Sequence, residues 1–205
     1  MINKKMSASG GYVSGVKKIK IEVSAHHAHL SRKDLDILFG KNYQLKPIKA
    51  LSQTGQFASK ETIKIKTKDG QIDDVRILGP TRPNTQVELS RTECFELKID
   101  PPVLECTCPD KKGGCAQVEI VGPKGKVKRC AAILAHRHIH CDPSSAKKMG
   151  LKNKQLVSVK TNGKRSITFH NILVRTRKDF VCRMHLDTDE ANAAGIKQGD
   201  FGQII

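Results

Sequence analysis

Hydrophobic and polar residues alternate along most of this chain, which predicts a protein built largely from β-strands. Asp69-Gly70 is typical of a tight turn between two such strands, and Gly79-Pro80 interrupts the second of them. Segment 41–61 lacks a clear pattern and is expected to be mostly loop. Strands are expected at 16–24, 61–68, 71–78, 117–122, 126–140, 156–162, 165–175 and 180–186.

Short helices are predicted where a residue that can cap a helix precedes a few helix-forming positions. Ser31 begins a helix that runs to Phe39, and Gly40 ends it. A second helix begins near Ser90 and is ended by the paired prolines at 101–102. Two more are expected at 142–150, with proline in the first helical position, and at 187–194.

Two histidine pairs with the same spacing mark an internal repeat. His27-Ala28-His29 and His138-Ile139-His140 each precede a helix-capping residue by two positions. Alternate residues of a strand point to the same face, so each pair presents two imidazoles side by side. This arrangement offers two nitrogen ligands to one metal ion.

The repeat also supplies a third ligand to each half. Aligning VELSRTE with MHLDTDE places Glu88 opposite His185. Three protein ligands leave one coordination position open, which is typical of a catalytic rather than a structural metal. Imidazole and carboxylate suit zinc, and also cobalt, manganese or iron. The predicted groups are His27, His29 and Glu88 in one half, and His138, His140 and His185 in the other.

Short strands, close turns and an internal repeat together indicate a mainly β fold. We expect two pseudo-symmetric small β-barrels with short capping α-helices. Pockets often lie between repeats, so the metal centre is expected at the junction of the two barrels.

The chain carries a net charge of +17, from 37 Lys and Arg against 20 Asp and Glu. This excess favours an acidic partner such as a nucleotide-like cofactor or a nucleic acid, or it reflects a generally basic surface. The lysines are scattered rather than clustered, so a nucleic-acid groove is not predicted. No apolar run approaches the ~20 residues that span a bilayer, and residues 1–18 lack the apolar stretch of a secretory signal.

Seven cysteines without a secretory signal predict reduced thiols. The segment from Cys106 through Cys108 to Cys115 has three sulfurs in an irregular spacing. It is interpreted as a surface loop with incidental thiols, with a partial zinc knuckle as the alternative.

Several segments together resemble the phosphate acyltransferases of the PduL type, the phosphotransacylases. The resemblance extends over about residues 16 to 197 and rests on SAHHAHLSRKDLDILFG, LSQTGQFASKETI, VRILGPTRPNTQVELSRT, the GPKG turn, HRHIH and MHLDTDEANAAG. It implies transfer of an acetyl or propanoyl group between coenzyme A (CoA) and inorganic phosphate, at two zinc ions held by the six residues named above. It also implies interleaved barrels, one from 1–25 plus 135–205 and one from 26–134.

The same resemblance implies roles for further residues. Arg82 is similar to the family's phosphate-binding arginine, and a guanidinium fork matches two phosphate oxygens. Gln53 and Gly125 also match site positions of the family, while His26 and His136 are interpreted as supporting or incidental. The Cys106 region departs from the family, which has a serine near the metals there. For CoA, the resemblance points to Ser24, Lys49, Arg76, Leu78, Phe95, His185 and Asn192.

The expected partners are therefore acyl-CoA and phosphate, with no nucleic acid or membrane and with a homo-oligomer possible. The alternatives are a metal-dependent hydrolase, which would use the same open centre to activate water, and a basic nucleic-acid-binding module. A cytoplasmic location is expected rather than a microcompartment lumen, because residues 1–15 show no amphipathic targeting helix. The sequence does not distinguish acetyl from propanoyl, which differ by one methylene.

Overall fold

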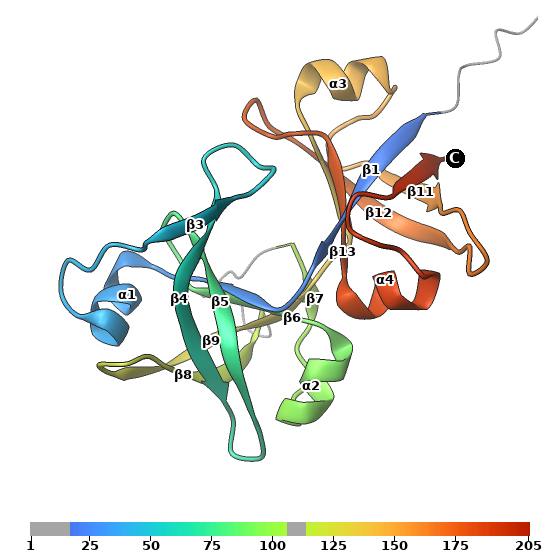
Figure 1. Ribbon diagram of the computed structural model, residues 1–205. Helices are drawn as coiled ribbons and strands as arrows, with labels where there is room; N and C mark the ends of the chain where they lie inside the picture. The colour runs from blue at the N-terminus through green and yellow to red at the C-terminus, as the bar shows by residue number, and fades with distance from the viewer. Residues whose placement is uncertain (1–16, 106–113) are drawn as a thin grey trace, which may run out of the picture.

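The computed structural model describes residues 17–105 and 114–205, which form two β-barrels side by side (Figure 1). The terminal barrel uses strands from both ends of the described chain and closes in the order β1-β13-β10-β12-β11-β14. Its elements are β1 (Lys18–Ser24), β10 (His138–Cys141), α3 (Pro143–Lys148), β11 (Leu156–Lys160), β12 (Thr168–Thr176), β13 (Arg183–Asp187), α4 (Thr188–Ala194) and β14 (Phe201–Ile204).

The central barrel is built from the chain between these parts. Its sheet closes in the order β4-β5-β2-β6-β9-β8, since β8 pairs with both β4 and β9, while β3 and β7 extend its edges. Its elements are β2 (His27–His29), α1 (Arg32–Phe39), β3 (Pro47–Ala50), β4 (Phe57–Lys66), β5 (Gln71–Gly79), β6 (Gln86–Leu89), α2 (Arg91–Leu97), β7 (Val103–Leu104), β8 (Ala116–Val121) and β9 (Lys126–Ala135).

The two barrels repeat the same pairing pattern. In the central barrel β2 pairs antiparallel with β6 and parallel with β5, and in the terminal barrel β10 pairs antiparallel with β13 and parallel with β12. The parallel pair β6 and β9 likewise corresponds to β13 and β1. The prediction of two pseudo-symmetric barrels with short helices is therefore confirmed.

Each barrel encloses its own aliphatic core. Alternate residues of the strands point inward, as Ile63 and Ile65 do on β4, and the polar residues between them face outward. The terminal core contains Ile21, Ile139, Ile172 and Met184. The histidines that flank Ile139 therefore point away from this core, which leaves them available at the surface between the barrels.

Several element boundaries differ from the sequence predictions. Segment 41–61, expected to be mostly loop, contains β3 and the first half of β4. The strand expected over 126–140 is two strands, because the chain leaves the central barrel after Ala135 and enters the terminal barrel at His138. The second helix ends at Leu97, before the two prolines, since Lys98 adopts a left-handed conformation.

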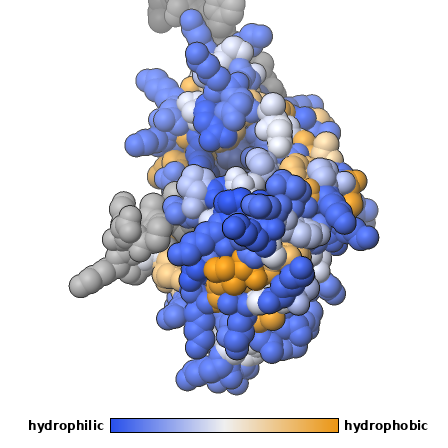
Figure 2. Space-filling view, turned by 90° about the vertical axis from the view of Figure 1, so that its left-hand side faces the viewer, coloured by the Kyte–Doolittle hydropathy of each residue, from blue (hydrophilic) through white to orange (hydrophobic). Residues whose placement is uncertain are grey.

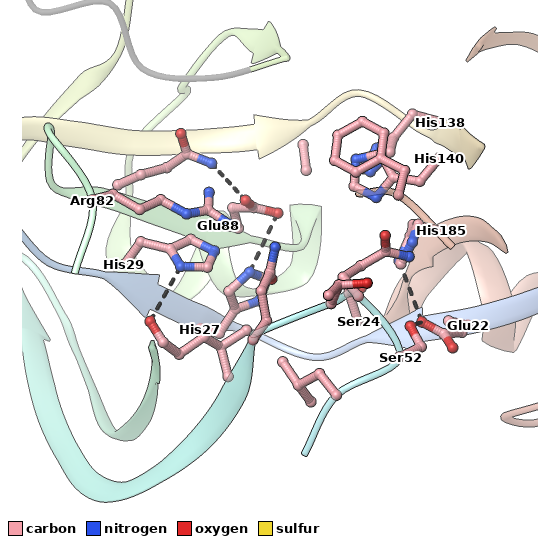
Figure 3. Close-up of a pocket in the computed structure, with 18 of the residues that line it drawn as sticks. Glu22, Ser24, His27, His29, Ser52, Arg82, Glu88, His138, His140 and His185 are labelled. Atoms are coloured by element: carbon pink, nitrogen blue, oxygen red, sulfur yellow. Dashed lines mark hydrogen bonds and ion pairs between the residues drawn. The ribbon is translucent and has the colours of Figure 1, made fainter. Parts of the chain in front are cut away.

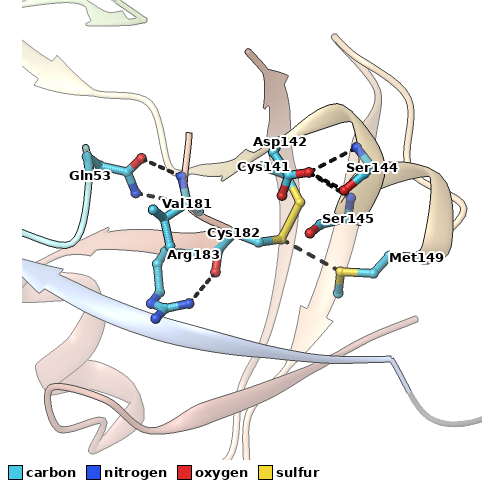
Figure 4. Close-up of a disulfide and its surroundings, with 9 residues drawn as sticks. All are labelled: Gln53, Cys141, Asp142, Ser144, Ser145, Met149, Val181, Cys182 and Arg183. Atoms are coloured by element: carbon cyan, nitrogen blue, oxygen red, sulfur yellow. Dashed lines mark hydrogen bonds between the residues drawn. A yellow bond between two sulfur atoms is a disulfide. The ribbon is translucent and has the colours of Figure 1, made fainter. Parts of the chain in front are cut away.

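The expectation of reduced thiols is wrong for four of the cysteines. Cys115 and Cys130 form a disulfide that joins the start of β8 to β9. Cys141 and Cys182 form another, which joins the end of β10 to the residue before β13 (Figure 4). Both pairs lie on neighbouring antiparallel segments, which the sequence separation of the residues conceals. Cys115 is thereby removed from the knuckle alternative, while Cys106 and Cys108 lie outside the described residues.

The face of the molecule that Figure 2 shows is largely hydrophilic, with several separate hydrophobic patches. This agrees with the excess of lysine and arginine in the sequence. Within the described residues, no helix has both the length and the apolar character required to cross a membrane.

Candidate metal centre between the barrels

The predicted ligands converge on one cavity between the two barrels. The cavity measures about 880 Å³ and is lined by residues of both, including the loop between β3 and β4. Each strand that carries a histidine pair runs along the junction, so both pairs open onto this space (Figure 3). A cavity of this size accommodates a cofactor-sized ligand.

The first group joins β2 to β6. His27 lies directly opposite Glu88 in the antiparallel pair, and His27 Nε2 is 3.5 Å from Glu88 Oε2. The donor atoms of His27, His29 and Glu88 all lie within 4.8 Å of one another. Gln86 donates a hydrogen bond of 2.5 Å to the other carboxylate oxygen, which holds Glu88 in place.

The second group joins β10 to β13 in the same way. His138 lies directly opposite His185, as His27 lies opposite Glu88. The donor atoms of His138, His140 and His185 also lie within 4.8 Å of one another. Phe180 stacks on the His140 ring with centroids 4.0 Å apart, which restricts its rotation.

Backbone carbonyls orient three of the imidazoles. Nδ1 of His27 donates to Ala25 and Nδ1 of His138 donates to His136, in each case the carbonyl two residues earlier, at 2.9 and 2.8 Å. Nδ1 of His29 donates to the Leu78 carbonyl at 3.3 Å. A carbonyl only accepts, so Nδ1 carries the proton and Nε2 keeps its lone pair for a metal.

Burial and neighbouring charges together set the protonation states of these groups. Desolvation, with His185 nearby, lowers the pKa of His138 to about 3, and desolvation lowers the pKa of His185 to about 4. Burial alone would raise the pKa of Glu88, but the neighbouring His27 reverses this effect and holds it well below its usual value. The second group is therefore neutral, and the first contains a carboxylate anion.

Polar atoms without a partner also mark the centre. Nδ1 of His140 and Nε2 of His185 are buried and lack a hydrogen-bond partner within the described residues. A buried unpaired nitrogen is costly, and a bound cation would remove that cost. The donor types, their separations and these unpaired atoms fit a pair of divalent ions such as zinc.

Arg82 lies at the first group, as its position in the sequence predicts. Its backbone N–H donates to the Leu30 carbonyl at 2.9 Å, and its side chain lines the cavity beside Glu88 (Figure 3). After burial and His27, the Arg82 guanidinium further lowers the pKa of His29, as expected for a cation close to that ring. A positive charge here can attract an anion toward the metal groups.

Gln53 reaches the cavity, but its amide is engaged elsewhere. Its Nε2 donates to the Val181 carbonyl and its Oε1 accepts from the Val181 N–H, both at 3.0 Å (Figure 4). These two bonds join the β3–β4 loop of the central barrel to the terminal barrel. Gly125 lies outside the cavity lining, in the turn between β8 and β9.

Five of the seven residues expected at the CoA subsite line the cavity, namely Ser24, Lys49, Arg76, Leu78 and His185. Arg76 also donates to the carbonyls of Ser59 and Lys60, at 3.2 and 2.8 Å. His185 belongs to the second group. Phe95 on α2 and Asn192 on α4 are exposed and do not line the cavity.

The structure also reveals neighbours of the centre that the sequence patterns did not indicate. Glu22 on β1 faces His185, and Arg175 on β12 lines the cavity beside the three histidines. His26, next to the first group, forms an ion pair with Glu93 of α2. The alternation of β1 places Glu22 on a polar face, which was the available signal for it.

Comparison with known proteins identifies the family of this chain. A family model described as phosphate propanoyltransferase matches residues 20–197. The phosphate propanoyltransferase of Thermotoga maritima is 46% identical over 189 residues, covering 91% of this chain and 89% of the relative. Those of Rhodopseudomonas palustris and Listeria monocytogenes are 42% and 41% identical over 188 residues each, covering 91% of this chain and 82% and 87% of the relatives. The chain therefore belongs to the phosphate propanoyltransferase family and is an acyltransferase.

Proposed function

We propose that this enzyme moves an acetyl or propanoyl group between CoA and inorganic phosphate at a centre of two zinc ions. The observation that carries the proposal is the convergence of two equivalent three-donor groups and Arg82 on one cavity. An acyl transfer between two anionic substrates needs positive charge and fixed positions for both of them, and this cavity offers both.

The two ions would be held by the six ligands of the two groups, with an open position at each. When bound, zinc would supply Lewis acidity toward the thioester carbonyl and affinity for the departing sulfur, because thiolate is a soft ligand. The backbone carbonyls of Ala25, His136 and Leu78 orient three of these ligands, because each accepts a hydrogen bond from a ring nitrogen.

Arg82 would hold the phosphate beside the thioester, with two of its N–H groups on two phosphate oxygens. A phosphate oxygen would attack the carbonyl carbon, the carbon–sulfur bond would break, and CoA would leave as the thiolate. Lys49 and Arg76 would contact phosphates of CoA along the cavity wall. Phe95 and Asn192 would contact the part of CoA that extends beyond the cavity.

The direct test is a CoA-release assay with acetyl-CoA and propanoyl-CoA, with and without phosphate, before and after chelation. We expect release that requires phosphate, that is lost on chelation, and that returns when zinc is added. Hydroxylamine should trap acyl phosphate as the product. Release of free acid without any need for phosphate would identify a metal-dependent hydrolase instead and overturn the proposal.

A further inference from the structure

The strand register relates two residues that stand beside the third member of each ligand group. On the parallel strands β1 and β13, Glu22 lies opposite His185. On the equivalent strands β9 and β6, Ile133 lies opposite Glu88. Glu22 and Ile133 therefore occupy the same position in the two halves, although one is charged and the other apolar.

This exchange places one carboxylate at each group. In the central barrel the carboxylate is Glu88 itself, and its neighbour Ile133 is fully buried and has no charge. In the terminal barrel all three donors are imidazoles, and the carboxylate stands beside them as Glu22. The carboxylate of the central barrel is thus a member of its donor group, whereas the carboxylate of the terminal barrel lies on the neighbouring strand β1.

The contacts of Glu22 are those expected of a residue that orients the His185 ring. Its Oε2 lies 3.8 Å from His185 Nδ1, while Nε2, the other nitrogen of that ring, is buried and has no hydrogen-bond partner within the described residues (Figure 3). A carboxylate at one ring nitrogen keeps the proton there and leaves the other nitrogen free for a metal. It also makes the free nitrogen a stronger electron-pair donor to a metal ion.

Glu22 is itself held from two sides. The Ser52 hydroxyl, in the β3–β4 loop of the other barrel, donates to Glu22 Oε2 at 2.6 Å. Arg183 of β13 lies 3.5 Å from Oε1. With only 17% of its side chain exposed, the carboxylate has a fixed position across the barrel junction.

We propose that Glu22 is a positioning residue for the three-histidine site, where it orients His185 and supplies the negative charge that this group lacks. Ser52 completes the arrangement from the central barrel, so that this site is assembled only when the barrels are docked. The inference rests on the proposed metal centre, and it assigns Glu22 no contact with substrate.

The test measures metal affinity rather than activity. In Glu22→Gln, one of two ions per chain should be lost to a competing chelator at about 10- to 100-fold lower chelator concentration than in the unaltered protein. The second ion should keep its affinity. Ser52→Ala should weaken the same ion by a smaller factor. Glu119→Gln, which removes a carboxylate on β8 outside the cavity, should leave both affinities unchanged.

The Glu88→Ala variant shows which of the two ions Glu22 affects. It should retain the ion of the three-histidine site, and adding Glu22→Gln should weaken that remaining ion. Equal affinity of both ions in Glu22→Gln and in the unaltered protein would overturn the inference. Equal weakening of both, with a lower melting temperature of the metal-free protein, would also overturn it, because it would indicate a general structural role. If the unaltered protein binds no ion, the proposed function itself fails.

Discussion

At the scale of single residues, hydrogen bonds from Nδ1 to backbone carbonyls decide which ring nitrogen of a histidine is left to bind a metal. His27 and His138 both donate from Nδ1 to the carbonyl two residues earlier. The two halves therefore share this hydrogen bond, which the H-x-H spacing alone does not predict. The same scale explains the basic residues around the cavity. Arg82 and Arg175 bring positive charge to the wall of the cavity that holds the two donor groups.

Replacing Arg82 with Ala should raise the KM for phosphate and lower kcat, because one charged contact to phosphate is lost. A bidentate contact of this kind contributes roughly 2–3 kcal/mol, or about 30- to 150-fold in kcat/KM for phosphate. Initial rates at varied phosphate measure this, with Arg91→Ala on exposed α2 as the control. Phosphate kinetics that match the unaltered enzyme would exclude this role for Arg82.

Glu190, at the start of α4, offers a prediction on pH. Burial, with Asp187 nearby, raises its pKa from 4.5 to about 7, and the ion pair with Arg137 offsets this only in part. A raised pKa means that the folded state favours the protonated acid, so stability is lost as the pH rises from about 4.5 through 7.

Glu190→Gln keeps the capping group and removes this titration. The variant should gain stability relative to the unaltered protein between pH 5 and pH 8, on the order of 1–3 kcal/mol. Melting temperatures of both proteins at these two pH values measure the difference. A difference that does not change with pH would contradict the prediction.

At the scale of elements, turns and caps place the ligand strands. The 122–125 turn packs against the end of α1, where Lys124 N–H donates to the Leu38 carbonyl at 3.0 Å. A Cβ on Gly125 would lie 2.6 Å from the Ile37 carbonyl oxygen, so glycine is required there by close approach. We infer that Gly125 supports the fold of the central barrel and does not contact substrate.

Gly125→Ala should therefore lower the free energy of unfolding by about 1–3 kcal/mol while leaving both substrate KM values unchanged. Chemical denaturation and steady-state kinetics test the two parts, and Lys126→Ala at the next position serves as the control. A higher phosphate KM without loss of stability would place Gly125 in the substrate site instead.

At the scale of the whole molecule, the cavity exists because two separately packed barrels dock. The contacts that join them include the two bonds between Gln53 and Val181, the bond from Ser52 to Glu22, and the bond from the Thr92 N–H to Asp189 at 2.8 Å. These polar contacts hold the two donor groups around one cavity.

Gln53→Ala should cost about 1–3 kcal/mol of stability, because the Val181 N–H and carbonyl both lose their partner. Activity should fall through kcat as the loop loosens, with little change in the KM for phosphate. Thermal unfolding and kinetics measure both effects, with Gln56→Ala in the same loop as the control. A variant with full stability and a raised phosphate KM would show that Gln53 binds substrate.

Local patterns indicated much of the fold and the candidate site. Alternation predicted most strands. The two H-x-H pairs and the aligned Glu88 and His185 gave six donors, which the structure does bring into two groups. The patterns gave wrong predictions where the structure depends on contacts between residues far apart in the chain. The pattern of residues 126–140 predicted one strand, but the chain changes barrels between Ala135 and His138. The pairing of neighbouring strands brings Cys141 to Cys182.

The sequence by itself determined the strand-rich repeat, the ligand types and their equivalence, because side-chain direction along a strand depends only on spacing. Only the tertiary structure decided that Glu22 stands where Ile133 stands in the other half, that Gln53 joins the barrels, and that both donor groups share one cavity. These features depend on which strands pair and how the barrels dock. Such contacts join residues far apart in the chain, and no local pattern records them.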